Sequence, residues 1–322
     1  MSAEPIGVTI AVPTFRRPDD LRSLIPLLQD QAAEASAGGR YAVDVLVVDN
    51  DPVGSAAEAA DAFPGVRYVG EPRPGIAVVR NRALDEASGS LLAFIDDDER
   101  PCPGWLAELL ATWTTTGAAA VSGRVLADYA GDLDPWIRAG DFFVRRRMPT
   151  GSEIDVAAAG NLLLDLRQVR GSGVRFESAL GLGGGEDTLF SRSLARAGGR
   201  MVWSDESAVV DRVPLERMTR RWVLTRAWSH GNASVLTDLR LSRGPADRVR
   251  IRVRSVARGL VRMGGGGARW CWGTVRGSLR HRARGLRAVL RGAGMVGGGL
   301  GVVYEEYARS GRRWRLARVV PR

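Results

Sequence analysis

Residues 91–99 have the sequence LLAFIDDDE, in which five apolar residues run directly into four acids. An uninterrupted apolar run of this length is typical of a strand buried on both faces of a parallel sheet. Four adjacent carboxylates repel one another, and a fold tolerates them best where a cation neutralises their charge. Carboxylate oxygens suit Mg²⁺ or Mn²⁺, and the spacing of Asp96 and Asp98 lets both side chains point the same way. The segment therefore predicts a buried strand that ends at a divalent metal site.

Two other apolar runs end in polar residues in the same way. Residues 8–12 are followed by Pro13 and Thr14, and residues 43–48 are followed by Asp49. Helical patterns alternate with these runs, which predicts an α/β fold with a mostly parallel sheet flanked by helices. Ligands of open α/β sheets bind outside the carboxyl ends of the strands, so three such runs indicate one shared site. The alternative for any single run is that Asp and Asn simply favour turns.

The chain contains 46 Arg and no Lys, and this absence of Lys excludes several kinds of chemistry. Without Lys there is no Walker A phosphate loop, no protein-kinase strand lysine and no Schiff-base lysine. With only two His, the chain also cannot form an H-E-x-x-H zinc site or a cage of several histidines. Catalysis by this protein is therefore expected to depend on carboxylates.

A glycine-rich loop at residues 181–185 precedes Glu186 and Asp187, which begin a helical pattern. The glycine spacing does not fit the G-x-G-x-x-G pattern of a dinucleotide site. Acids in a first helical turn stabilise the helix dipole by about 0.3–1 kcal/mol and need no other role. However, a chain with no Lys and few His has a carboxylate as its natural proton acceptor.

Charge is distributed unevenly along the chain. From residue 240 onward there are 21 Arg and 3 acids, a net charge of +18, so residues 1–239 carry −8 of the total of +10. In the region after residue 240, apolar residues recur at spacings of three and four with arginines between them, which predicts basic amphipathic helices. We expect the glycines at 264–267 and 297–299 to break these helices and to act as hinges. The basic face suits an anionic membrane or a nucleic acid, or it is simply solvated while the helices pack on the first domain.

The N-terminal residues, the length of the apolar windows and the Cys spacing indicate where in the cell the protein is expected. No basic segment precedes the first apolar run, and the uncharged window at residues 109–123 is shorter than the ~20 apolar residues of a spanning helix. The two Cys lack C-x-x-C spacing, which is typical of a reducing compartment. These features predict a protein that is soluble or attached to a membrane from one side.

Taken together, the order and spacing of these residues resemble glycosyltransferase family 2, whose members are inverting enzymes with the GT-A fold. The resemblance extends over residues 8–231 and is greatest to the bacterial exopolysaccharide branch, which includes the succinoglycan-type transferases. The matching segments are VPTF (12–15), VVDN (47–50), RN (80–81), FIDDD (94–98), GN (160–161) and GGED (184–187).

The resemblance implies a role for each matching residue. The expected nucleotide-sugar ligands are Pro13, Thr14, Asp49, Arg80, Asp96 and Asp97. Asp98, together with Asp96, is expected to hold Mg²⁺ or Mn²⁺, and Asp187 is the expected catalytic base. The expected acceptor-binding residues are Gly160, Asn161, Glu186, Arg221 and Trp222. The implied reaction is a direct displacement, in which an acceptor hydroxyl attacks the anomeric carbon of a nucleotide-diphosphate sugar and inverts its configuration.

The chain departs from the family pattern at two places. Many relatives have a His shortly before Val-Pro, near a third metal position, whereas this chain has Asp211. Either Asp211 replaces that ligand with an oxygen, or the metal keeps an extra water. Processive relatives carry Gln-x-x-Arg-Trp, and this chain retains Arg221 and Trp222 but has Met218 in place of the Gln. The missing Gln favours transfer of one sugar per encounter. For Trp222, the alternative to binding the acceptor is simple helix packing.

The sequence thus predicts a GT-A glycosyltransferase domain at residues 1–239 and a basic amphipathic helical region at residues 240–322. We expect a cytoplasmic enzyme held on the inner face of the cell membrane by its basic region, with a UDP-sugar donor, a glycan or lipid-linked acceptor and no nucleic-acid partner. Two alternatives stay open: an inactive carbohydrate-binding or assembly protein, and a sugar nucleotidyltransferase. The second usually needs a glycine-rich loop with basic residues near the N-terminus, often including Lys.

Overall fold

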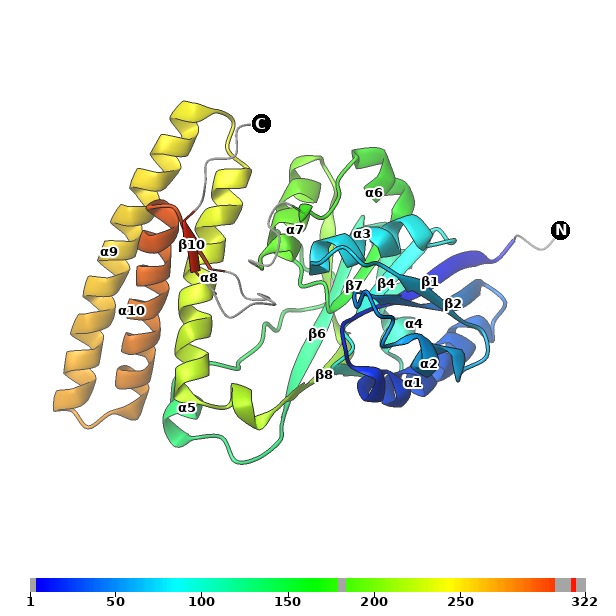
Figure 1. Cartoon of the computed structure of the whole chain (residues 1–322), viewed down its shortest axis with the longest axis horizontal. Coiled ribbons are helices and arrows are strands. Elements are labelled where there is room, and N and C mark those ends of the chain that lie inside the picture. Colours follow the sequence, from blue (N-terminus) through cyan, green and yellow to red (C-terminus); the bar gives the residue numbers. More distant parts are fainter. Residues whose placement is uncertain (1–3, 179–183, 305–313, 317–322) are drawn as a thin grey trace. The chain divides into compact units, whose positions relative to one another are not determined.

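The computed structural model describes residues 4–178, 184–304 and 314–316 (Figure 1). Its internal contacts divide the chain into two compact units. Unit 1 comprises Met1–Ala127, Arg145–Gly181 and Glu186–Arg212, and unit 2 comprises Asp128–Val144, Leu182–Gly185 and Val213–Arg322. This division differs from the boundary expected after residue 239, because helix α8 (Arg220–Arg240), which spans that boundary, groups with the later helices in unit 2.

Unit 1 is built around a mixed β-sheet. In the described residues the strand order is β3-β2-β1-β4-β7-β6-β8-β5. The strands are β1 (Ile6–Thr14), β2 (Tyr41–Asp49), β3 (Val66–Gly70), β4 (Leu91–Ile95), β5 (Glu99–Pro101), β6 (Ala120–Tyr129), β7 (Asn161–Asp165) and β8 (Met201–Val213).

The first half of this sheet is parallel and confirms the α/β class predicted from the apolar runs. β1 pairs with β2 and β4 in parallel, with Thr14 opposite Asp49 and Ala11 opposite Phe94. This register brings the polar ends of the three runs to one edge of the sheet. The other half was not anticipated: β7 pairs antiparallel with β4 and with β6, and β5 pairs antiparallel with β8.

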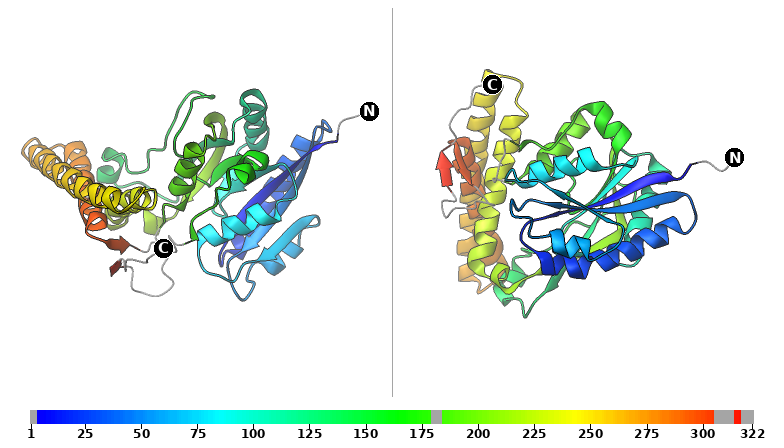
Figure 2. Two further views of the ribbon diagram at one scale, coloured as in Figure 1. Left: turned by 90° about the horizontal axis from the view of Figure 1, so that it is seen from above. Right: turned by 45° about the vertical axis from the view of Figure 1, so that its right-hand side comes forward.

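Helices cover both faces of the unit 1 sheet (Figure 2). They are α1 (Pro18–Ser36), α2 (Ala57–Asp61), α3 (Ile76–Glu86), α4 (Trp105–Thr116), α6 (Leu166–Ser172) and α7 (Glu186–Arg196). Successive side chains of a strand face opposite sides, so Ile10 packs in the cluster with Leu24 of α1, while Ala11 packs in the cluster with Ala77 of α3. Burial on both faces explains why the strands are apolar without alternation.

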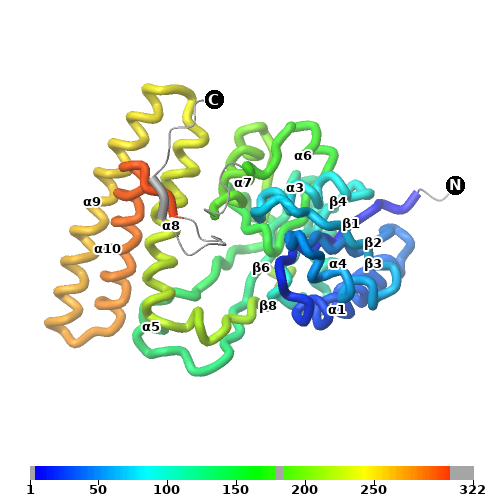
Figure 3. The backbone as a smooth tube through the Cα atoms, in the orientation of Figure 1, coloured from blue at the N-terminus to red at the C-terminus, as the bar shows by residue number. Residues whose placement is uncertain are grey.

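Unit 2 is largely helical. Besides α8, it contains α5 (Pro135–Ala139), a 3₁₀ turn (Leu215–Arg217), α9 (Pro245–Val275), α10 (Leu279–Gly299), β9 (Val302–Tyr304) and β10 (Trp314–Leu316). Helix α10 packs against both α9 and α8, and Figure 3 traces α9 and α10 as two long neighbouring segments. Among the described helices, none combines the length and the apolar character that crossing a bilayer requires.

The expectation that glycines interrupt the basic helices is wrong. Helix α9 continues through residues 264–267, and α10 includes residues 297–299. The physical reason is close helix packing: a Cβ added to Gly266 would lie 2.8 Å from the Gly285 carbonyl oxygen, and one added to Gly292 would lie 2.6 Å from that of Gly259. These glycines let the two helix backbones touch, so they are contact points between helices and not hinges.

Candidate active site

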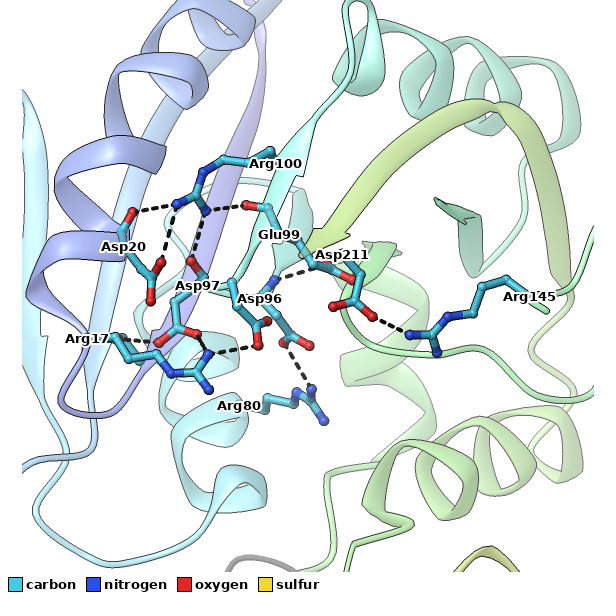
Figure 4. Close-up of polar contacts among 11 residues, drawn as sticks. Arg17, Asp20, Arg80, Asp96, Asp97, Glu99, Arg100, Arg145 and Asp211 are labelled. Carbon is cyan, nitrogen blue, oxygen red and sulfur yellow. Dashed lines mark hydrogen bonds and ion pairs between the residues drawn. The ribbon is translucent and has the colours of Figure 1, made fainter. Parts of the chain in front are cut away.

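The acids that follow β4 form a cluster in unit 1, in which Asp97 and Glu99 are buried and Asp96 and Asp98 are partly exposed (Figure 4). Glu99, at the start of β5, lies opposite Asp211 of β8 in the strand register. The Glu99 carboxylate accepts a 3.4 Å hydrogen bond from the Asp96 backbone N–H. A Cβ on Gly160 would lie 2.8 Å from Glu99 Oε2 and 2.9 Å from Asp96 Oδ2. Gly160 therefore allows the chain before β7 to approach these carboxylates closely.

Burial and mutual repulsion act together on these acids. Burial raises the pKa of Glu99 well above its ordinary value, and the charges of Asp96, Asp98 and Asp211 raise it further. Burial also raises the pKa of Asp96, where Arg80 opposes the shift and the charges of Asp98 and Asp187 add to it. The structure thus brings Asp96, Asp98, Asp187 and Asp211 into one electrostatic neighbourhood, as expected from their positions in the sequence.

Asp97 and Asp98 are held by groups at the end of β1 and at the N-cap of α1. The Thr14 hydroxyl donates to Asp97 Oδ2 at 2.8 Å, and Arg17 Nη1 lies 2.7 Å from Asp97 Oδ1 and 2.9 Å from Asp98 Oδ2. Burial raises the pKa of Asp97 to about 6, although Arg17 and Thr14 act against that rise. The two acids in turn raise the pKa of Arg17, against the effect of its own burial. Arg17 thus belongs to this cluster of charged side chains and was not predicted from the sequence.

Arg80 connects the acid cluster to the start of α7. Its guanidinium is buried, with Nη1 2.6 Å from Glu186 Oε1 and Nη2 3.4 Å from Asp96 Oδ1, and it lies 5.7 Å from the ring centroid of Phe176. Arg80 and Glu186 were expected to contact the donor and the acceptor, respectively. The structure pairs them with each other, which links α7 to the end of β4, and their contacts with donor and acceptor stay predictions.

Asp187 begins α7 beside Glu186. Burial raises the pKa of Glu186, Arg80 opposes the shift, and the charge of Asp187 raises it further. Within the described part of the chain, the hydrogen bonds of the Asp187 carboxylate both reach Oδ1, from the Thr188 backbone N–H at 2.6 Å and the Thr188 hydroxyl at 3.3 Å. Thr188 thus orients the Asp187 carboxylate at the start of α7.

Two of the expected ligand-binding residues have their polar atoms engaged inside the fold. Asp49 accepts hydrogen bonds from the backbone N–H groups of Asp51 and Ala56 and from the Tyr68 hydroxyl, at 2.8, 2.9 and 3.2 Å. Asn161 accepts a 2.8 Å bond from the Trp105 indole and donates to two backbone carbonyls. Both side chains are buried, and each shapes the loop or strand end on which it lies.

The remaining expected residues differ in their placement. Pro13 is buried in β1, opposite Val48. Arg221 and Trp222 lie in unit 2, on α8, where Trp222 stacks on Phe143 with ring centroids 5.9 Å apart. The glycine loop before α7 falls partly outside the described residues, which resume at Gly184.

The chemistry of the acid cluster fits a hard divalent cation. Its donors are carboxylate oxygens, and their mutual pKa elevation shows that nearby positive charge would stabilise them. Within the described ranges, no group of three His, Cys, Asp or Glu is arranged as a ready metal cage. Mg²⁺ commonly binds through one or two protein carboxylates plus substrate phosphates, so such a cage is not required. Asp211, the candidate third ligand, forms an ion pair with Arg145 (Figure 4).

Comparisons with known sequences identify relatives of this chain. Residues 9–165 match the family model for Glycosyl transferase family 2. The chain is 36% identical over 236 residues to the succinoglycan biosynthesis protein ExoM of Rhizobium meliloti, an alignment that covers 72% of this chain and 75% of that protein. It is 27% identical over 127 residues to the glycosyltransferase AglE of Haloferax volcanii, covering 38% of this chain and 40% of that protein.

Solved structures agree at the level of the fold. S. aureus TarS residues 1–349, in complex with UDP-GlcNAc, superposes with a TM-score of 0.51 at 13% identity, covering 88% of this chain and 91% of TarS. GalNAc-T7 with UDP, GalNAc and Mn²⁺ superposes with a TM-score of 0.52 at 12% identity, covering 73% of this chain and 51% of that one. Both are GT-A glycosyltransferases, and the GT-A fold expected from the sequence is confirmed.

Proposed function

The chain belongs to glycosyl transferase family 2, and we propose that it is an inverting, metal-dependent enzyme that transfers one sugar per encounter from a nucleotide-diphosphate sugar. The observation that carries this proposal is the cluster of Asp96, Asp98 and Asp187 at the carboxyl edge of the sheet, where the charges of Asp98 and Asp187 act on Asp96 and Arg80 joins Asp96 to Glu186. Ligands of α/β sheets bind at this edge, and the cluster supplies both a proton acceptor and cation ligands there.

Asp187 is the proposed catalytic base. Thr188 donates to Oδ1 from one side, which orients the carboxylate. The acceptor hydroxyl loses its proton to Asp187, and its oxygen forms the new bond to the anomeric carbon. The bond from that carbon to the diphosphate breaks, and the nucleoside diphosphate leaves with the electron pair. A single displacement of this kind inverts the anomeric configuration.

Asp96 and Asp98 are the proposed ligands of Mg²⁺ or Mn²⁺. Enzymes with this fold are generally dependent on a divalent metal, which when bound supplies charge stabilisation to the departing diphosphate. Arg17 holds Asp98 and Asp97 in place, while Arg80 orients Asp96. Two roles stay open for Asp211. It is either a third oxygen ligand of the metal, or it stays paired with Arg145 while the metal keeps an extra water.

The partners of the reaction are proposed from the relatives. The names of two structural neighbours include UDP or UDP-GlcNAc, which favours a UDP-sugar donor. The name of the relative from Rhizobium meliloti places that protein in succinoglycan biosynthesis, and we extend this to a glycan or lipid-linked acceptor in bacterial exopolysaccharide synthesis. Pro13, Thr14, Asp49 and Asp97 complete the proposed donor side of the site.

A thermal-shift panel of nucleotide sugars with Mn²⁺ tests the donor and metal assignments. We expect one nucleotide sugar to raise the melting temperature only when Mn²⁺ is present, since a ligand at 100 times its Kd stabilises the native state by about 2.7 kcal/mol. Asp98→Ala is expected to remove this metal-dependent shift. Asp155→Ala, which removes an exposed acid outside the cluster, is the matched control.

Product assays with the same nucleotide sugars separate the two alternatives. A shift without any hydrolysis of the nucleotide sugar would support an inactive binding protein. Exchange of a sugar 1-phosphate into a nucleotide sugar would identify a nucleotidyltransferase. Either result would contradict the proposed transferase activity.

We also propose that the basic helices attach the enzyme to the anionic inner face of the cytoplasmic membrane. The interior of the α9–α10 pair supports this, because every buried residue of these two helices is small. Those of α9 are Ser255, Gly259, Gly266 and Gly273, and those of α10 are Ala283, Gly285, Gly292, Gly294, Gly298 and Gly299. Helices that pack in lipid use small residues in this way, whereas helices in water normally bury their large apolar side chains.

The large apolar side chains of α9 lie on its outside. Val249, Val253 and Leu260 recur at helical spacing and are 61%, 65% and 56% exposed. Residues 245–299 contain 13 Arg and a single acid, Asp247. Exposed apolar side chains combined with a strongly basic charge fit the interface of an anionic bilayer, where each Arg contributes up to about 1 kcal/mol.

Vesicle co-sedimentation tests this attachment. The full chain is expected to bind vesicles that contain phosphatidylglycerol far more tightly than pure phosphatidylcholine vesicles, and to be released by salt. Val253→Asp with Leu260→Asp is expected to weaken binding at least tenfold, because both insertion and charge attraction are reduced. The control for an added Asp is Val53→Asp, which places one such charge at an exposed apolar position of unit 1. Equal binding to both kinds of vesicle would rule out the electrostatic account.

A further inference from the structure

The connection between α9 and α10 forms the exposed end of a helical hairpin, here called the hairpin tip (residues 270–280). Four large apolar side chains are exposed there, namely Trp270, Trp272, Val275 and Leu279, and Val275 is 82% exposed. Among the Trp residues whose burial the structure describes, Trp270 and Trp272 are the exposed ones. Large apolar side chains gathered at one exposed place mark an interaction surface.

The apolar side chains of the hairpin tip do not form a single flat face. Trp270 and Trp272 are two positions apart and therefore lie on nearly opposite sides of α9, since successive residues of a helix turn by about 100°. Val275 ends α9, and Leu279 begins α10. Apolar groups thus surround the end of the hairpin. A fluid medium can enclose such an end, whereas a folded partner would need a matching socket.

The backbone of the hairpin tip is closed by its own hydrogen bonds. The Ser278 N–H donates to the Gly273 carbonyl at 2.8 Å, and the Gly277 N–H donates to the Thr274 carbonyl at 3.3 Å. Gly277 has a φ of +64°, the left-handed conformation that this kind of helix C-cap requires. The Ser278 hydroxyl then caps α10 by accepting from the His281 N–H at 3.4 Å. Few backbone groups of this turn would therefore lose a partner in a medium that excludes water.

The charged side chains of the hairpin tip are all cationic. Arg276 and Arg280 are exposed, and the Arg276 guanidinium lies 4.6 Å from the ring centroid of Trp272. No Asp or Glu occurs between residues 248 and 304. Long arginine side chains can keep their charge at the surface of a membrane while their stems lie along apolar groups. This combination is complementary to anionic lipid headgroups above an apolar layer.

The hairpin tip lies at one end of the two helices (Figure 1). Helix α8 packs near the other end of α10, where a Cβ added to Gly298 would lie 3.0 Å from the Val235 Cβ. Towards the tip, the segment after α5 reaches Ala283, whose Cβ would lie 3.0 Å from a Cβ added to Gly140. These contacts are made at Ala283 and beyond, and the exposed residues of the hairpin tip come before them.

We propose that the hairpin tip inserts into the interface of an anionic bilayer. Trp270 and Trp272 then lie at the level of the lipid headgroups, which Trp rings favour, and Val275 enters the apolar layer beneath them. Arg276 and Arg280 extend to the lipid phosphates. The inference rests on the membrane attachment proposed above, and it adds which segment of the chain enters the lipid.

A fluorescent label on Cys271 tests the insertion. Cys271 is exposed and lies between the two Trp residues, so it can be labelled with nitrobenzoxadiazole in the full-length Cys102→Ser variant. On addition of phosphatidylglycerol vesicles, the emission is expected to rise and to shift to shorter wavelength, because the label leaves water. Nitroxides on the upper acyl chains are expected to quench it. A label on Val249→Cys, near the other end of α9 in a chain without the native Cys residues, is the control and should shift less.

Replacement of the two rings tests their contribution to binding. Trp270→Ala with Trp272→Ala is expected to weaken binding to phosphatidylglycerol vesicles at least tenfold, because two interfacial anchors are lost while every arginine is retained. Val144→Ala with Leu215→Ala is the matched control, since it shortens two exposed apolar side chains of unit 2 outside α9 and α10. This control should bind vesicles like the wild type. Melting temperatures of both double variants verify that they fold.

The outcomes separate this inference from the attachment itself. If the chain binds anionic vesicles but the Cys271 label emits as in water, or the double Trp variant binds like the wild type, insertion of the hairpin tip is wrong and the attachment stands. If the chain binds no vesicles, the proposed attachment is wrong and the inference fails with it. Tighter binding to a single-stranded oligonucleotide than to vesicles, with the same shift of the label, would identify a nucleic-acid surface and also overturn the inference.

Discussion

Asp187→Asn is expected to abolish glycosyl transfer while donor binding stays close to that of the wild type. An amide has nearly the shape of the carboxylate and can still accept the hydrogen bond from Thr188 through its oxygen, so α7 should begin as before. It cannot take a proton from the acceptor hydroxyl. Loss of a general base slows a reaction about 10²–10⁴-fold, and initial rates at saturating donor and acceptor measure this directly.

The neighbouring acid provides the decisive comparison. Glu186→Gln leaves the Asp187 carboxylate itself unchanged but weakens the 2.6 Å ion pair with Arg80. We therefore expect a smaller decrease in rate, caused by misorientation of α7. If Asp187→Asn retains wild-type rates while Glu186→Gln loses them, the base is Glu186 and the present assignment is wrong. Asp155→Asn, on the exposed surface of the same unit, controls for the change in charge.

Gly266→Leu is expected to destabilise the α9–α10 pair. A Cβ at this position would lie 2.8 Å from both the Gly285 carbonyl oxygen and the Val289 backbone nitrogen. Neither backbone atom can move without separating the helices. Overpacking of a tight interface costs about 1–3 kcal/mol, and thermal unfolding of the purified chain measures the loss.

Gly264→Leu is the matched control for this prediction. It lies two residues earlier in the same helix, and nothing is within 4 Å of its added Cβ. Replacing an exposed helical Gly by Leu removes up to about 1 kcal/mol of unfavourable propensity, so this variant should be as stable as the wild type or more so. Equal destabilisation by the two substitutions would show that the glycines do not mediate helix contact.

The parallel half of the sheet and its acidic edge were predictable because both depend on local sequence. Continuous apolar runs mark strands buried on two faces, and the register of β1 with β2 and β4 then aligns Thr14, Asp49 and the acids after Ile95. The antiparallel half was not predictable from such runs, because strand direction there depends on long connections. The pairing of Glu99 with Asp211 joins residues more than a hundred positions apart.

Arg17 and the glycines were missed for different physical reasons. Arg17 is one of 46 arginines, and nothing in its own sequence context shows that it will face Asp97 and Asp98. The glycines of α9 and α10 have low helix propensity, which favours a break when each helix is considered alone. Packing reverses that preference: Gly259, Gly266 and Gly273 recur every seven residues on the face that contacts α10.

The configuration of the released sugar is the measurement that tests the central claim most directly. The central claim is a single displacement with Asp187 as the base. In the absence of an acceptor, water takes the place of the acceptor hydroxyl, and proton NMR during the first minutes follows the free sugar before it mutarotates. From an α-linked nucleotide sugar, the account predicts that the β anomer forms first and that Asp187→Asn forms neither anomer at a measurable rate. Initial release of the α anomer would contradict the account.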